Sequence, residues 1–77
     1  MPSDPPDWVL ARRRVIGARI RAARTAAQLS QIQLGERAGI DHKTVHRLEY
    51  GTSDPRLSVL LRIAGVVGVP LADLVRE

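Results

Sequence analysis

Four side chains that can donate hydrogen bonds recur one helical turn apart within a single short segment. They are His42, Lys43, His46 and Arg47. The i, i+4 spacing of each pair would place all four on one side of a helix. Lys and Arg donors fit the O6 and N7 atoms of guanine, and His can donate to base or phosphate acceptors. This pattern favours contact with a nucleic acid.

The two histidines also have a spacing that can hold a metal ion on one helical face. The chain contains no cysteine, and no acidic residue lies between His42 and His46. The neighbouring Lys43 and Arg47 would repel a cation. We therefore expect no metal, no cofactor and no enzymatic activity.

Composition and charge fit one small folded domain with a polyanionic partner. The 77 residues are 44% hydrophobic and 26% charged, and the formal net charge is +4. Residues 1–11 carry a charge of −2, residues 12–47 carry +7, and residues 48–77 carry −1. A basic half beside a nearly neutral half indicates an oriented surface for nucleic acid.

Other features restrict the compartment. The absence of cysteine is compatible with a reducing cytosol. No apolar run approaches the ~18 residues of a membrane span, and the N-terminus lacks the order of a signal peptide. We expect a cytoplasmic, nucleoid-associated protein that contacts no membrane and no small-molecule ligand. A fragment of a longer regulator would have the same composition and charge, so that alternative stays open.

The elements that must position the four donors are all helices. Three prolines predict an extended tail over residues 1–7, which leaves a domain over residues 8–77. Asp7 is expected to cap the first helix, which starts either at Trp8 or nearer Val15. The later helices are expected at 31–38, 42–50, 57–67 and 71–75.

Local signals set the ends of the two central helices. Ser30 followed by Gln33 forms a capping-box pattern, and Gly39 is suited to the left-handed residue that ends a helix. Asp41 can cap the next helix, whose Val45 and Leu48 would face the core. Gly35 lies mid-helix, where a small residue would let the next helix cross closely.

These residues resemble the Cro/repressor, or Xre-type, lambda-repressor-like helix-turn-helix family. The resemblance spans about residues 15–75 and implies a compact all-α domain of five helices, in which the second and third form the helix-turn-helix. Its motif residues are Leu29-Ser30-Gln31, Leu34-Gly35, Ala38-Gly39-Ile40, Val45, Leu48-Glu49 and Gly51, followed by Pro55, Leu57, Leu60, Ile63-Ala64, Gly68 and Leu74.

The resemblance implies a role for each candidate residue. It makes the chain a sequence-specific transcriptional regulator that binds double-stranded DNA, with residues 42–50 in the major groove. His42, Lys43, His46 and Arg47 would read bases, and Ser30, Gln31, Thr44, Thr52 and Arg56 would contact phosphates. Gln31 would also support the reading helix.

Two further assignments concern structure and assembly. Arg24 and Glu49 match a buried ion pair that links the first helix to the end of the third. Members of the family commonly act as homodimers on palindromic operators. The candidate dimer residues are Leu61, Val66, Leu71 and Val75.

Some residues depart from the family pattern. Ile32 and Val59 replace polar residues, which favours an alternative function as a protein-interaction module, such as an antitoxin or a coactivator-like partner. The cluster Arg12-Arg13-Arg14 has two interpretations, an arm along DNA or a solvated run of charge.

Overall fold

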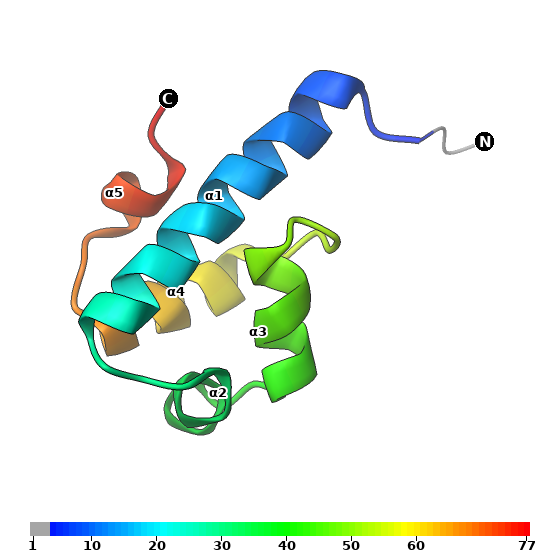
Figure 1. The fold of residues 1–77 in the computed structure, drawn as a ribbon. Coiled ribbons are helices and arrows are strands. Elements are labelled where there is room, and N and C mark those ends of the chain that lie inside the picture. Colours follow the sequence, from blue (N-terminus) through cyan, green and yellow to red (C-terminus); the bar gives the residue numbers. More distant parts are fainter. Residues whose placement is uncertain (1–3) are drawn as a thin grey trace.

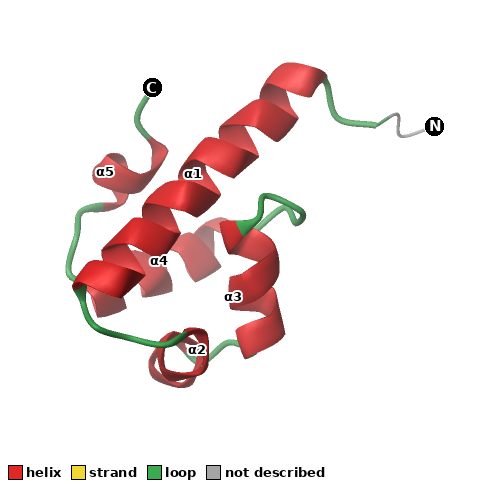
Figure 2. Cartoon of the chain, viewed as in Figure 1, coloured by secondary structure: helices red, strands yellow, loops and turns green. Residues whose placement is uncertain are grey.

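The computed structural model describes residues 4–77, and within that range the chain forms five helices and no strand (Figures 1 and 2). Residues 1–3 of the expected tail lie outside the described part. The helices are α1 (Asp7–Ala26), α2 (Gln31–Ala38), α3 (His42–Glu49), α4 (Leu57–Val67) and α5 (Leu71–Val75). The predicted all-α architecture of five helices is confirmed.

The longest helix, α1, contacts three of the other helices. It packs against α3, α4 and α5, while α2 packs against α3 and α4. In Figure 1 α3 lies beside the middle of α1 and α2 lies near the C-terminal end of α1, while the C-terminus lies on the opposite side of the molecule from α3. The predicted pair of central helices is thus held at the edge of the bundle.

The core takes one fully buried side chain from every helix. These are Ile20, Leu34, Val45, Ile63 and Leu74. Each helix therefore buries apolar surface only when the others are in place, which ties the five short elements into one cooperative unit.

The short helices begin and end where local chemistry predicts. The Ser30 hydroxyl accepts a hydrogen bond from Gln33 N at 3.0 Å, and the Gln33 side chain accepts one from Ser30 N at 2.9 Å. Gly39 has a φ of +72° at the end of α2. The Asp41 carboxylate accepts from Lys43 N at 2.8 Å at the start of α3. These caps satisfy backbone groups that a helix cannot satisfy internally.

One local expectation was wrong. Asp7 does not cap α1, because the helix already includes it and Pro6 occupies the cap position. Leu57, the first residue of α4, is 63% exposed although it belongs to the sequence motif.

Two glycines allow close approach between helices. A Cβ on Gly35 would lie 2.6 Å from Ile40 O, which confirms that the turn into α3 needs a small residue there. A Cβ on Gly17 would collide with the backbone carbonyls of Leu48 and Glu49 at the end of α3. Glycine is a poor helix former, so the sequence indicates only that Gly17 weakens the first helix locally. The contact that requires a glycine at this position is tertiary, with the end of α3.

We predict that Gly17→Ala destabilises the protein and that Gly65→Ala stabilises it. The first change should cost about 1–3 kcal/mol because backbone atoms must move. Gly65 lies inside α4 with nothing within 4 Å of an added Cβ, so alanine should add about 0.5–1 kcal/mol. Urea unfolding followed by circular dichroism measures both. Equal effects of the two substitutions would contradict the close approach of α1 and α3.

Candidate nucleic-acid interface

Helix α3 has one buried face and one exposed face. Val45, Leu48 and Glu49 are buried, and Val45 and Leu48 belong to the core. The four predicted donors on the other positions, His42, Lys43, His46 and Arg47, are all exposed. The structure therefore brings these four side chains together on one outward face.

Neighbouring side chains restrict the two histidines on that face. The His46 ring lies against the ring of Tyr50, with centroids 4.6 Å apart and planes tilted by 42°. His42 Nδ1 lies 3.5 Å from an Asp41 carboxylate oxygen. Tyr50 was missed by sequence reasoning, although its i+4 spacing from His46 was a usable signal.

A buried carboxylate joins three helices beneath this face. Arg24 Nε lies 2.6 Å from Glu49 Oε2, and Arg24 Nη2 donates to Glu49 Oε1 at 3.0 Å. Gln31 Nε2 donates to the same Oε1 at 3.1 Å. We call Arg24, Gln31 and Glu49 the Glu49 network; it links α1 and the first residue of α2 to the last residue of α3.

The burial and charge of the Glu49 network fit a rigid structural support for α3. The side chain of Glu49 is 1% exposed and that of Arg24 is 13% exposed. The hydrogen bonds that Arg24 donates to Glu49 raise the pKa of the Arg24 guanidinium, against an opposing effect of burial, so Arg24 stays charged at neutral pH. Arg24 Nη1 also donates to Leu29 O at 2.8 Å, which orients the chain entering α2.

The candidate phosphate-contacting residues lie at helix ends and loops around α3. Ser30 is exposed within its capping box, and Gln31 directs its amide nitrogen at Glu49. Thr52 is exposed and donates to Arg47 O at 3.2 Å, just after α3. Arg56 is exposed immediately before α4, and Thr44 is half-buried.

Within the Arg12-Arg13-Arg14 cluster, Arg12 and Arg13 make contacts inside the chain and Arg14 is exposed. Arg12 Nη2 donates to Val75 O at 3.1 Å and to Arg76 O at 2.7 Å, at the end of α5. Arg13 forms an ion pair of 3.5 Å with Asp54. Two of the three arginines thus make intramolecular contacts between distant parts of the chain, which the local sequence did not indicate.

The candidate dimer residues differ in their surroundings. Leu61 is 52% exposed on α4. Val66, Leu71 and Val75 are partly buried and pack against the chain's own core.

The two apolar residues that depart from the family pattern also differ in their burial. Ile32 is 54% exposed, whereas Val59 packs against the core. Only Ile32 still favours the protein-interaction alternative.

Residues 4–77 contain no group of three or more His, Cys, Asp and Glu side chains placed to hold a metal ion. None of the five helices combines the length and the apolar character that a bilayer crossing needs.

A family model described as helix-turn-helix matches residues 20–74. The chain belongs to the helix-turn-helix family. The matched region contains the capping box, the Gly39 turn, the exposed face of α3 and the Glu49 network, which agrees with the resemblance seen in the sequence.

Two phage repressors are similar to this chain in sequence. The chain is 34% identical over 62 residues to an immunity repressor protein of Bacillus phage phi105, covering 80% of this chain and 43% of that protein. It is 30% identical over 63 residues to the cryptic phage CTXphi transcriptional repressor RstR of Vibrio cholerae, covering 82% and 57%. The chain thus spans about half the length of the curated relatives it matches.

Two solved structures have the same fold. The restriction-modification controller protein C.AhdI of Aeromonas hydrophila superposes with a TM-score of 0.81 at 31% identity, covering 83% of this chain and 97% of that one. A hypothetical transcription factor, NHTF, of Neisseria gives 0.80 at 27% identity, covering 97% and 85%.

We predict that the helix-turn-helix domain depends on the Arg24–Glu49 pair. Arg24→Met should cost about 3–5 kcal/mol because it leaves the Glu49 carboxylate buried without its cation. The double substitution Arg24→Met/Glu49→Leu should recover much of that loss. Urea unfolding measures all variants.

Arg13→Met provides the matched control. It removes an ion pair whose Asp54 partner is largely exposed, so it should cost less than about 1 kcal/mol. An Arg24→Met variant as stable as Arg13→Met would show that the network does not support α3.

Proposed function

We propose that the chain is the DNA-binding domain of a sequence-specific transcriptional regulator, with α3 in the major groove of double-stranded DNA. The observation that carries this proposal is the exposed face of four donors on a helix whose opposite face is buried. An α-helix fits the major groove, where each base pair presents a distinct pattern of donors and acceptors. The proposal assigns a binding role and no catalytic one.

The side chains on the exposed face of α3 can form hydrogen bonds with the edges of base pairs. Lys43 and Arg47 would donate to guanine O6 and N7, and His42 and His46 would donate to base acceptors. Packing of His46 against Tyr50 and the contact of His42 with Asp41 reduce the conformational freedom of both rings before DNA arrives.

Phosphate contacts would set the register of α3. Ser30 and Gln31 open α2, whose N-terminal N–H groups favour an anion. Thr44, Thr52 and Arg56 would contact phosphates on the other side of α3. In this arrangement Gln31 would use one amide hydrogen for Glu49 and would have the second available for DNA.

The proposed assembly is a homodimer on a palindromic operator. Leu57 and Leu61 lie one turn apart on α4, and both are more than half exposed. These two residues support a surface centred on α4. The partial burial of Val66, Leu71 and Val75 favours a supporting role for them beneath that surface.

We predict that Lys43→Ala and Arg47→Ala each weaken specific DNA binding by about 1–3 kcal/mol, since each would remove a base contact. Selection from a random DNA pool should first yield a palindromic site, and fluorescence anisotropy on that site then measures affinity. Arg76→Ala removes the same charge at the far end of the molecule and should change affinity little. Unchanged specificity in both α3 variants would contradict the assignment of α3 as the reading helix.

We predict that Leu61→Glu converts the dimer to a folded monomer, because it places a charge in an apolar contact. Ile32→Glu makes the same change at an exposed position on α2 and should leave the dimer intact. Analytical ultracentrifugation measures the mass of each. A monomeric parent chain, or a dimeric Leu61→Glu variant, would contradict the α4 surface.

A further inference from the structure

Helix α1 crosses the C-terminal end of α3 over two successive turns. Gly17 lies against the backbone carbonyls of Leu48 and Glu49. One turn earlier, Arg14 lies against Gly51, because a Cβ on Gly51 would be 2.9 Å from both Arg14 N and Arg14 Cγ. The backbone and the first part of the Arg14 side chain are therefore held at the end of α3.

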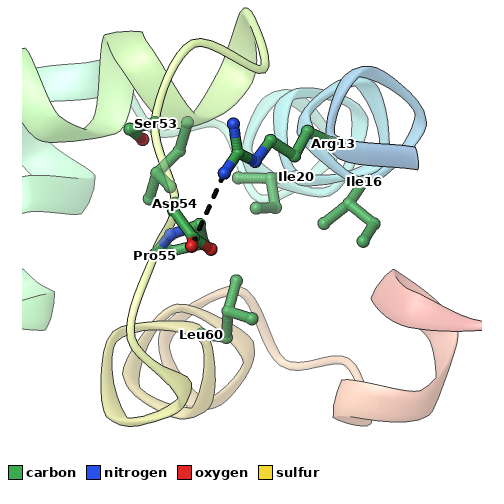
Figure 3. Close-up of a pocket in the computed structure, with 8 residues that line it drawn as sticks. Arg13, Ile16, Ile20, Ser53, Asp54, Pro55 and Leu60 are labelled. Atoms are coloured by element: carbon green, nitrogen blue, oxygen red, sulfur yellow. Dashed lines mark ion pairs between the residues drawn. The ribbon is translucent and has the colours of Figure 1, made fainter. Parts of the chain in front are cut away.

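The charge of Arg14 differs from its neighbours in having no partner within the described part of the chain. Arg12 donates to backbone carbonyls at the end of α5. Figure 3 shows Arg13 reaching from α1 toward Asp54, with which it forms an ion pair. Arg14 is exposed, and its guanidinium forms no hydrogen bond or ion pair with residues 4–77. This charge is available to a partner outside the chain.

Helical geometry places Arg14 beside α3 and away from the core. It precedes Gly17 by three residues, so it lies on the side of α1 that meets α3. At about 100° of rotation per residue, Arg14 points more than about 100° away from the core-facing Ile16 and Ile20. The long side chain therefore extends into solvent next to the end of α3.

The residues around Arg14 belong to the proposed DNA interface. Gly51 lies between Tyr50 and Thr52 in the chain. The Tyr50 ring packs against His46 on the exposed face of α3, and Thr52 is a proposed phosphate contact. A helix in the major groove has a sugar-phosphate backbone along each edge of that groove. A cation at the end of α3 is thus suited to meet one of these backbones.

We propose that Arg14 binds a phosphate of double-stranded DNA at the edge of the groove that α3 occupies. This inference rests on the proposed function, and it adds a contact from a part of α1 that precedes the family match over residues 20–74. The planar guanidinium pairs well with two oxygens of one phosphate. The contact reads no base; it adds affinity and fixes the orientation of α3 in the groove.

The salt dependence of DNA binding tests this contact. Each phosphate that a protein neutralises adds about 0.9 to the slope of log affinity against log salt concentration. Arg14→Gln should therefore lower the slope by about 0.9, which is a loss of roughly 8-fold at about 0.1 M salt that vanishes near about 1 M. The loss should be equal on the selected palindromic site and on unrelated DNA. Arg14→Lys keeps the charge and should retain most of the slope.

Two controls accompany this measurement. Arg14→Gln keeps the aliphatic stem that lies against Gly51, so its urea unfolding should match that of the parent chain. Arg76→Gln removes the same charge near the C-terminus, which lies on the opposite side of the molecule from α3 in Figure 1, and should leave the slope unchanged.

Phosphate ethylation locates the contact on the DNA. Ethylation removes the charge of a single phosphate, so in the parent chain it should weaken binding at one phosphate at the edge of each half-site. The same modification should have no further effect on Arg14→Gln, because that variant has already lost the contact.

Two outcomes would overturn the assignment of Arg14 and leave the proposed function standing. The first is a salt slope of Arg14→Gln equal to that of Arg76→Gln, as expected if the Arg14 charge serves an acidic protein partner. The second is a changed base preference of Arg14→Gln in selection from a random pool. A parent chain that selects no DNA site would overturn the proposed function itself, and the Arg14 contact with it.

Discussion

The position of α3 depends on the buried carboxylate of Glu49. A charge that is 1% exposed is tolerated only when it is paired and hydrogen-bonded, and here Arg24 and Gln31 provide both conditions. Removing Arg24 leaves the Glu49 carboxylate buried without its cation. The requirement therefore couples α1, the start of α2 and the end of α3 into one arrangement.

This coupling explains how an eight-residue helix can present side chains in a defined direction. A helix of eight residues is unstable in isolation, because nucleation costs free energy and its few hydrogen bonds do not offset that cost. The Asp41 cap secures its first turn, the core residues Val45 and Leu48 hold its inner face, and Glu49 secures its last turn. Rigid positioning of this kind limits the entropy lost when the exposed face binds.

The loop after α3 differs from α3 in how closely it is packed. Helix α3 packs against α1 so closely that Gly17 has no room for a Cβ. Residues Ser53 to Pro55, by contrast, border two hollows, one toward α1 and one toward α3, and α4 lines both. The loop is thus packed less closely against its neighbours than α3 is at Gly17.

The bounds of α2, α4 and α5 could be predicted from the sequence, because they follow from interactions among neighbouring residues. The Ser30–Gln33 box, the Gly39 turn and the Asp41 cap each act within three residues of a helix end. The same holds for the outward face of α3, which follows from helical periodicity. The pairing of Arg24 with Glu49 was reached through family resemblance, since a separation of 25 positions gives no local signal.

The sequence by itself determined the five helices, the caps of α2 and α3 and the residue types on the exposed face of α3. Tertiary structure alone decided that Gly17 must be small, that Arg12 binds carbonyls at the end of α5, and that Val59 packs inward while Leu57 stays exposed. The roles in DNA contact and in the dimer are still proposals. The division has one physical reason: caps and periodicity act over a few residues, whereas burial and ion pairing depend on which distant segments meet.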